Sequence, residues 1–467
     1  MQFDSLSFVI FLVIVLSIYY VVSSWKFKKA VLLISSYLFY AAWSPPFVVL
    51  IWISTFTDYF IAKLLGQCVG RIKRKIFLIF SLVVNLGILG YFKYADFLIE
   101  SFCQIMLSVG VEYSPVTSEV LLPVGISFYT FQTLSYTLDV YRKKIQPSNS
   151  LLDFSLYVTF FPQLVAGPIV RAVDFLPQCV EEKKLSLSGM SWGAGLIIFG
   201  LFQKIVLADA LFSPFVDSFF SGQLTINLFE NWLSVFCFSM QIYYDFAGYS
   251  LCAIGTALML GFSLPDNFKS PYSALGFSDF WRRWHITLSS WLRDYLYISL
   301  GGDRKGKFIL YRNVLITMLL GGLWHGASWN FVLWGGVHGM LLVVDRWLKS
   351  KKYLKLPNIL VVLITFVVVS MVWIPFRSSE FIVTLRILES LIDLKLLVLP
   401  ELNGHKVIAL AVIILTLCYQ YRRKDKMLDD LLESVHPVII CFGISASIFL
   451  ISIFSTGDSR AFIYFQF

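Results

Sequence analysis

The sequence is poor in charge and lacks the motifs of most soluble enzymes. Only 14% of its 467 residues are charged, whereas 58% are hydrophobic and 17% are aromatic. Soluble globular domains carry about 25% charged residues, so this composition excludes an ordinary soluble fold. Apolar stretches long enough to cross a hydrocarbon core of roughly 30 Å recur along the whole chain. We therefore predict an all-α polytopic protein of the lipid bilayer, folded as a single domain over residues 1–467.

Motifs for nucleotides, metals and disulfides are missing from the sequence as well. It contains no Walker, Rossmann or zinc-protease pattern, which argues against an ATP-driven pump or a membrane metalloprotease. The seven cysteines are an odd number and show neither CxxC nor Cys/His ligand spacing. We expect buried thiols, no metal site and no tightly bound cofactor. The net charge of +9 is attributed to loops at the membrane surface, so no nucleic-acid partner is expected.

Basic clusters follow every second apolar stretch. They lie at residues 26–29, 71–75, 142–144, 349–352 and 422–426. Under the positive-inside rule these clusters are cytoplasmic, which places the N-terminus on the outer face. The apolar run that begins at Leu6 has no basic region before it and no small-residue cleavage site after it. We expect it to be the first spanning helix and not a removed signal peptide.

The apolar pattern predicts about eleven to thirteen membrane segments. The clearest are residues 5–24, 30–43, 47–65, 76–94, 119–138, 151–169, 188–208, 229–262, 308–323, 357–375 and 437–455. The stretch 229–262 is long enough for one tilted helix or for two short ones.

Residues 264–307 interrupt the alternation of apolar spans. In the run SDFWRRWHITLSSWLRDYLYISLGGDRKGK (278–307), apolar residues recur at three- and four-residue steps: Trp281, Trp284, Leu288, Trp291 and Tyr295. This spacing predicts an amphipathic helix that lies in the interface or re-enters at the cytoplasmic side, with its tryptophans as interfacial anchors. Arg282 and Arg283 on its basic face are candidates to bind a phosphate-bearing donor such as coenzyme A or a phosphopantetheine arm.

Two histidines directly follow tryptophans: His285 in this run, and His325 in LLGGLWHGASWN. The apolar stretch 308–323 has about sixteen residues and rises roughly 24 Å, which places His325 at membrane depth. An ionisable group there is costly, so a functional site is favoured over a histidine hydrogen-bonded between helices. For His285 a functional role and a role as membrane anchor remain equally open.

Other polar residues in apolar surroundings are candidates to line a tunnel or to support the histidines. They are Asp245, Gln132, Trp324, Asn330 and His338. A lone Asp at the depth of Asp245 needs a partner or must be protonated, and a proton-coupled transporter would use such a residue too. His338 is interpreted as a packing or supporting group.

The chemistry of these residues leaves three functions open. A histidine without a Ser or Cys nucleophile motif suits general-base activation of a hydroxyl, which then attacks a pre-activated acyl group. The alternatives are a polysaccharide or lipid transporter, which needs no acyl thioester, and an assembly protein of an exopolysaccharide complex, which tolerates loss of both histidines.

Taken together, these motifs resemble the membrane-bound O-acyltransferase (MBOAT) family, and within it the bacterial alginate O-acetyltransferase group. The resemblance rests on FYTFQTLSYTLDVYR (128–142), FFPQLVAGPIVR (160–171), YYDFAGYS (243–250), DFWRRWHITLSSWLRDYLYISLGG (279–302), GGLWHGASWNFVLWGGVHG (321–339) and the ending FIYFQF.

The resemblance implies a helix bundle around a central tunnel in the bacterial cytoplasmic (inner) membrane. His325 matches the essential intramembrane histidine of the family, and His285 matches its cytoplasm-side active-site position. Acetyl-coenzyme A, or another acyl thioester, is then the co-substrate, and a hydroxyl of a secreted polysaccharide is the acceptor. A periplasmic acetyltransferase partner protein usually completes the transfer. A related branch moves D-alanine to teichoic acid, but WLRDYLYISLGGDRKGK is more similar to the alginate type.

Overall fold

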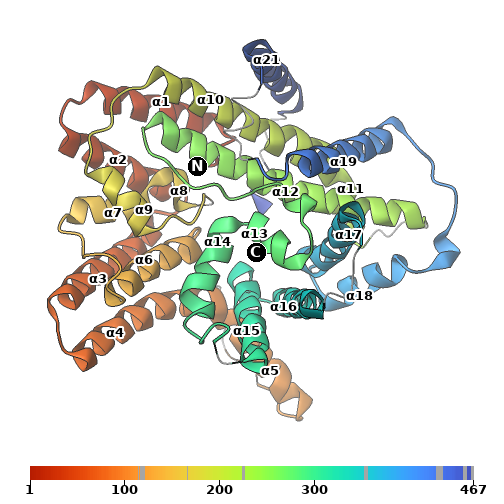
Figure 1. Ribbon diagram of the computed structural model, residues 1–467, viewed down its shortest axis with the longest axis horizontal. Helices are drawn as coiled ribbons and strands as arrows, with labels where there is room; N and C mark the ends of the chain where they lie inside the picture. Colours follow the sequence, from red (N-terminus) through yellow and green to blue (C-terminus); the bar gives the residue numbers. More distant parts are fainter. Residues whose placement is uncertain are drawn as a thin grey trace. The chain divides into compact units, whose positions relative to one another are not determined.

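A computed structural model describes residues 1–113, 115, 121–165, 167–222, 227–304, 306–351, 356–426, 435–455 and 460–463. These residues form α-helices with short 3-10 and π-helical turns, and no strand occurs among them (Figure 1). The all-α prediction is therefore confirmed. The chain divides into two compact units, residues 1–194 with 253–265 and residues 195–252 with 266–467. A single domain and a central tunnel stay predictions.

Eight helical stretches in the described part of the chain are long and apolar enough to cross a membrane, which makes this a multi-pass membrane protein. They are Pro45–Gln67, Arg71–Ser108, Leu187–Phe220, Lys307–His325, Trp329–Lys349, Asn358–Arg377, Gly404–Arg423 and Pro437–Phe454. A further apolar helix, Leu6–Val21, is shorter. The larger number of eleven to thirteen segments includes more polar stretches and stays a prediction.

The first unit contains the N-terminal helices. They are α1 (Leu6–Val21), α2 (Trp25–Ala41), α3 (Val48–Gln67), α4 (Arg71–Leu89), α5 (Ala95–Ser108), α6 (Ile126–Tyr141), α7 (Leu151–Thr159), α8 (Phe161–Leu164) and α9 (Ala172–Phe175). Helices α3, α4 and α6 lie side by side (Figure 1). They enclose Asp58, whose carboxylate accepts hydrogen bonds from Asn85 Nδ2 (2.8 Å) and Thr137 Oγ1 (2.9 Å). A buried carboxylate is tolerated there because its oxygens are hydrogen-bonded.

The predicted span over residues 151–169 is wrong. Helix α7 ends at Thr159 after nine residues, which rise only about 14 Å. The chain turns at Phe160 and continues in α8, where Pro162 occupies the first turn. Proline is favourable at a helix start but removes a hydrogen bond inside a longer helix, so Pro162 favours a break between α7 and α8.

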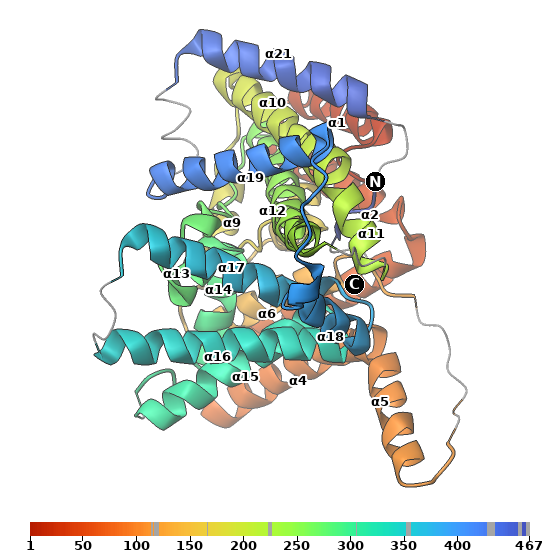
Figure 2. The ribbon, with the colours of Figure 1, turned by 90° about the vertical axis from the view of Figure 1, so that its right-hand side faces the viewer.

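The second unit contains most of the C-terminal helices. They are η4, a π-helix (Phe202–Phe212), α11 (Ser213–Phe220), α13 (Phe277–Arg283), α14 (Ile286–Trp291), η6, a π-helix (Leu292–Tyr297), α15 (Lys307–His325), α16 (Trp329–Lys351), α17 (Asn358–Arg377), α18 (Phe381–Ser390), α19 (Gly404–Arg423) and α21 (Pro437–Phe454). Helices α10 (Leu187–Leu201) and α12 (Leu228–Met259) contribute to both units. Since α12 is continuous over 32 residues, the single-helix alternative for this stretch holds. Within the unit, α17 and α21 run in one direction and α16 and α19 in the other (Figure 2).

The predicted amphipathic helix is broken at Trp284 and His285, and Trp284 is no interfacial anchor. Helix α13 ends at Arg283, and α14 begins only at Ile286. Trp284 is 1% exposed, and its ring centroid lies 4.9 Å from that of Trp373 in α17. The helical periodicity of this segment therefore reflects burial inside the protein and not a surface that faces lipid.

Helices α15 and α16 form a closely packed hairpin, and α15 ends at His325. A Cβ atom added to Gly322 would lie 2.2 Å from the carbonyl oxygen of Phe331, and one added to Gly335 would lie 2.3 Å from that of Met318. The glycines near His325 therefore serve helix-to-helix contact, because only a hydrogen atom fits between the two backbones.

Candidate functional site

The structure brings the two predicted histidines together in the second unit. The ring centroids of His285 and His325 lie 6.3 Å apart, although η6 and α15 separate them in sequence. Both side chains are buried, with 0% and 5% of their surface exposed. The two Trp-His pairs thus lie close together, while a catalytic role for each histidine stays a prediction.

His285 occupies a strained position in the backbone. It caps the N-terminus of α14 with φ +43°, in the left-handed region that non-glycine residues rarely adopt. Backbone hydrogen bonds on both sides hold it there: Ile286 N–H donates to the carbonyl of Asn267, and Lys269 N–H donates to the carbonyl of Arg283, each over 2.9 Å. Such conformations cost about 1 to 3 kcal/mol and cluster at functional sites.

The imidazole of His285 is held in one orientation by Asn267. Nδ1 lies 3.0 Å from Asn267 Oδ1, which also accepts a hydrogen bond from Thr287 Oγ1 over 2.9 Å. Asn267 Nδ2 in turn donates to Ser250 Oγ over 3.3 Å. Since Oδ1 is the acceptor, Nδ1 carries the proton and Nε2 keeps its lone pair. Nε2 has no hydrogen-bond partner among the described residues.

Burial keeps His285 uncharged. The residue lies outside the eight candidate spans, and desolvation lowers its pKa to about 3. At neutral pH the ring is therefore a neutral base with an available nitrogen. Asn267, which determines its tautomer, was not predicted, because nothing in the run DNFKS indicates that it contacts a histidine eighteen residues further on.

Aromatic rings surround His325 at the C-terminal end of α15. Its ring centroid lies 5.1 Å from that of Trp324, 5.0 Å from Trp334 and 5.4 Å from Phe376, all edge-to-face. Trp324 also lies 6.0 Å from His285. The two histidines therefore share an apolar interior, in which electrostatic interactions are stronger than in water.

Asn330 and His338, two of the four predicted supporting residues in this unit, lie on α16. Asn330 Nδ2 donates to the carbonyl of Ser378 over 2.9 Å and so connects the start of α16 to the end of α17. His338 is fully buried, and its ring lies 4.8 Å from Trp334, which in turn contacts His325. Neither nitrogen of His338 has a hydrogen-bond partner among the residues that the structure describes.

Asp245 has the partner that its depth requires. Its Oδ1 lies 2.6 Å from Lys204 Nζ, and both side chains are nearly inaccessible to solvent. Lys204 also contacts Asp209 over 3.1 Å, and the backbone N–H of Ile463 donates to Asp245 Oδ2 over 2.8 Å. We had not predicted Lys204, although a lysine within the apolar run LIIFGLFQKIVLADALF was a visible signal.

The remaining predicted residues are Arg282, Arg283 and Gln132. Arg282 is exposed, whereas Arg283 donates to Asp279 Oδ2 over 2.9 Å and to the carbonyl of Lys269 over 3.4 Å. Donor binding by these arginines stays a prediction, and Arg282 is the freer of the two to bind a ligand. Gln132 is buried in α6 and belongs to the first unit.

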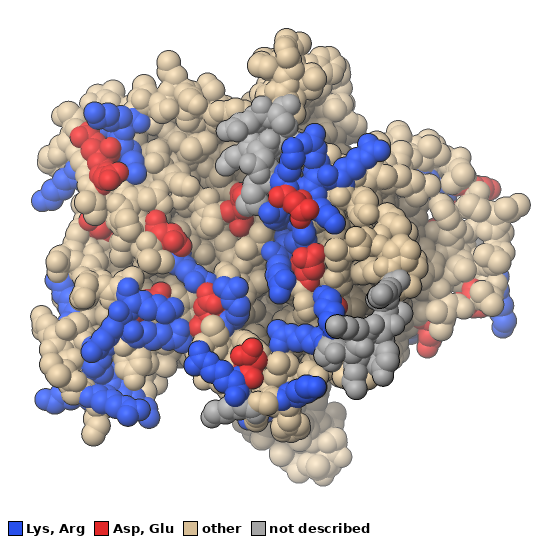
Figure 3. Space-filling model, viewed as in Figure 1, with Lys and Arg blue, Asp and Glu red and all other residues tan. Residues whose placement is uncertain are grey.

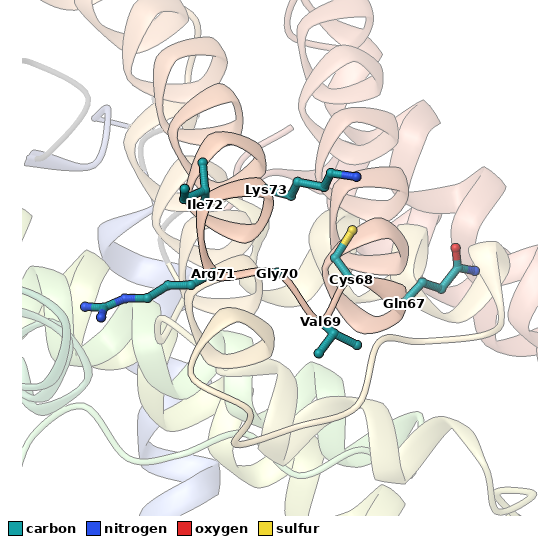
Figure 4. Close-up of a pocket in the computed structure, with 7 residues that line it drawn as sticks. All are labelled: Gln67, Cys68, Val69, Gly70, Arg71, Ile72 and Lys73. Atoms are coloured by element: carbon teal, nitrogen blue, oxygen red, sulfur yellow. The ribbon is translucent and has the colours of Figure 1, made fainter.

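Two hollows of different character occur in the described structure. One, in the second unit, has a volume of about 350 Å³ and is lined by Lys204, Asp209, Asp217, Gln241, Asp245, Arg377, Arg460, Ala461 and Ile463. The other, in the first unit, has a volume of about 640 Å³ and is formed by the seven consecutive residues Gln67 to Lys73. In Figure 4 these side chains point in different directions and do not converge on a centre. We do not interpret this turn as a binding site, since binding sites bring a few polar groups together.

The described residues include no group of three or more His, Cys, Asp or Glu side chains that could hold a metal ion. The site therefore consists of two imidazoles, their aromatic surroundings and an adjacent charged network. The described residues thus define a multi-pass helical membrane protein with two imidazoles in an apolar interior.

Comparison with known families identifies the class more closely. Residues 80–373 match the membrane-bound O-acyltransferase (MBOAT) family, and the chain belongs to that family. The resemblance seen in the sequence is thereby confirmed.

Individual relatives agree with this assignment. The chain is 40% identical over 411 residues to the probable alginate O-acetylase AlgI of Pseudomonas aeruginosa, covering 88% of this chain and 78% of that protein. It is 37% identical over 397 residues to the peptidoglycan O-acetyltransferase of Helicobacter pylori, covering 79% and 74%. The teichoic acid D-alanyltransferase of Bacillus subtilis is 29% identical over 262 residues, covering 52% and 65%. These relatives support a membrane O-acyltransferase with a polymer acceptor.

Proposed function

We propose that this protein transfers an acetyl group from a cytoplasmic thioester, acetyl-coenzyme A, to a hydroxyl on the other side of the membrane. The acceptor is a secreted polysaccharide or a periplasmic partner protein that passes the group on. Relatives named as O-acetylases of alginate and of peptidoglycan support an acetyl donor and a glycan acceptor. The proposal places the chain in the bacterial inner membrane with its N-terminus outside, because the basic clusters then lie in the cytoplasm.

The observation that carries the proposal is the pairing of His285 with His325 in one buried interior. In a direct transfer, the hydroxyl oxygen attacks the thioester carbonyl carbon while His325 takes its proton. The C–S bond then breaks and the thiolate receives a proton. In a covalent version, His325 attacks first and holds the acyl group briefly. His285 positions the thioester in both versions, and its neutral ring and fixed tautomer suit that role.

A basic surface supports a phosphate-bearing donor. Arg282 is exposed close to His285 in sequence, and Arg422 and Arg423 occupy the last turn of α19. Figure 3 shows Lys and Arg side chains gathered beside that end of α19. Guanidinium groups bind phosphate through paired hydrogen bonds, so they would attract the nucleotide end of coenzyme A.

No observation favours transport over acyl transfer. Asp245 was the residue that a proton-coupled transporter would share, but its ion pair with Lys204 gives it a structural explanation. An assembly protein would not need two imidazoles at 6.3 Å in an apolar interior.

One assay tests the proposal against both alternatives. Purified protein in lipid vesicles is supplied with labelled acetyl-coenzyme A and an extract that contains the acceptor, and thioester consumption and labelled product are measured. His325→Ala should lower the transfer rate at least about 100-fold, the contribution expected of a general base. His405→Ala, at an exposed position, is the matched control and should keep the wild-type rate. Equal rates for both variants would refute the proposal.

A further inference from the structure

Aromatic side chains from three helices fill the space around His325. The rings of Trp324, Trp334 and Phe376 come from α15, α16 and α17, which lie side by side (Figure 2). Each ring stands at 69° to 84° to the imidazole, with ring centroids 5.0 to 5.4 Å away, and each residue is at most 4% exposed. A substrate that reacts at His325 therefore meets a wall of large, buried rings.

Two of these rings are held in place by further rings. The ring of Trp334 stacks on that of Trp373 with centroids 5.6 Å apart, and Phe376 lies 5.2 Å from each of these two tryptophans. Phe331 also contacts Phe376, over 5.0 Å. Because close-packed interiors have few voids, neither Trp334 nor Phe376 can shift without displacing a neighbour.

The backbone directly after His325 is packed just as closely. A Cβ atom added to Gly326 would lie 2.1 Å from Cε2 of Phe331, far inside ordinary van der Waals contact. The ring of Phe331 therefore lies directly against the main chain at Gly326, where only a hydrogen atom fits. The same ring contacts Phe376, so Phe376 cannot move toward this part of the backbone to make room.

The place of the acyl chain follows from the proposed transfer. The carbonyl carbon of a thioester carries the sulfur on one side and the acyl chain on the other. When His285 positions the thioester and the carbonyl carbon lies beside His325, the chain extends among the rings that surround His325. An acetyl group places a single methyl group there. Each longer homologue adds a methylene, which has to displace a packed ring, and such overpacking is unfavourable.

We propose that Trp334 and Phe376 determine the length of the acyl chain that the site accepts. Their rings occupy the space that the third and fourth carbons of a propionyl or butyryl group would need, so the site is restricted to two carbons. One methylene that does not fit a hydrophobic pocket changes kcat/KM about 10- to 200-fold. This inference rests on the proposed function and adds the two residues that limit its donor.

A series of donors tests the inference. The full-length protein in lipid vesicles receives the acceptor extract and acetyl-, propionyl- or butyryl-coenzyme A, and kcat/KM for thioester consumption is measured with each. The wild type should prefer acetyl over propionyl about tenfold or more, and acetyl over butyryl about 100-fold or more. Phe376→Ala should raise the propionyl-to-acetyl ratio about tenfold or more, because it removes a whole ring. This ratio does not depend on the amount of folded protein, so a purely structural role of Phe376 would leave it unchanged.

Two further variants complete the test. Phe238→Ala is the matched control, because it removes an equally buried ring of the same unit, which packs against Phe220, and it should keep the wild-type ratio. Trp334→Phe is the milder change, for use if Phe376→Ala does not fold, and should also raise the ratio.

Two results would overturn the inference: a wild type that uses butyryl-coenzyme A as well as acetyl-coenzyme A, or variants at Trp334 and Phe376 that keep the wild-type ratio. In either case the proposed function would still stand if consumption of acetyl-coenzyme A depends on His325. If His325→Ala consumes it as fast as the wild type does, the proposed function itself fails, so the two failures are distinguishable.

Discussion

Asn267 should control the reactivity of His285, although it has no contact with substrate in the proposed mechanism. Asn267→Ala removes the oxygen that accepts hydrogen bonds from His285 Nδ1 and from Thr287 Oγ1. A hydrogen bond of about 1 kcal/mol favours one tautomer roughly fivefold, so loss of this preference should lower kcat by up to about that factor. KM for the acyl acceptor should change little, because no binding group is removed.

Asn267→Asp tests, through the pH dependence of activity, whether Asn267 controls His285 or has only a structural role. It keeps the acceptor oxygen but places a carboxylate about 3 Å from the imidazole. An adjacent negative charge favours the protonated ring, so the pKa of His285 should rise from about 3 by roughly 1 to 3 units. The variant should then lose activity as the pH falls from 7 to 5, whereas the wild type should show no such loss from this group.

The assay is the rate of acetyl transfer between pH 5 and pH 9, with thermal unfolding measured in parallel. Ser239→Ala is the control, because it removes a buried hydrogen bond to Ser370 (2.8 Å) in the same unit without contacting either histidine. It should lower stability to a similar degree and leave the pH profile unchanged. If Asn267→Asp keeps the wild-type profile, the assigned tautomer of His285 is wrong.

Three further predictions concern stability. Lys204→Met leaves the carboxylate of Asp245 buried and uncompensated, so the free energy of unfolding should fall by about 3 to 5 kcal/mol, as measured by denaturant or thermal unfolding. Gly322→Ala forces a methyl group against the carbonyl of Phe331 and should cost at least about 1 to 3 kcal/mol, seen as a lower yield of folded protein. Because the pKa of His285 is lowered to about 3 on folding from about 6.5, the unfolded chain binds the proton first and stability should fall as the pH drops between these values. Between pH 6.5 and 5 the expected loss is about 2 kcal/mol, and His285→Gln should remove it.

Long apolar runs were predicted well because a membrane span depends on composition over some twenty residues. The predicted stretches 308–323, 357–375 and 437–455 each lie on a helix with ends within about two residues. The prediction failed where one or two residues decide the backbone. The stretch 151–169 is interrupted at Phe160, just before Pro162 in the first turn of α8, and the left-handed conformation of His285 breaks the amphipathic helix.

In the site, too, residues within a local sequence motif could be predicted, whereas the residues that contact them could not. Both histidines could be identified from their Trp-His pairs, since an imidazole in an apolar sequence is conspicuous. Asn267 and Lys204 could not be assigned, because they contact His285 and Asp245 from segments distant in sequence. Such pairings follow from the tertiary structure and leave no periodicity in the chain.

The distance between the two imidazoles limits how they can share protons. Two positive charges 6.3 Å apart repel each other by about 2.6 kcal/mol at an effective dielectric constant of 20, which corresponds to about two pH units. A charge on His325 would therefore oppose protonation of His285 further, so the His285 ring, whose pKa burial already lowers to about 3, stays neutral near neutral pH. Acyl transfer from a thioester to an alcohol releases one proton from the hydroxyl and delivers one to the thiolate, so the reaction takes up no net proton. A neutral His285 in an apolar interior thus suits a transfer in which no net charge has to enter the membrane.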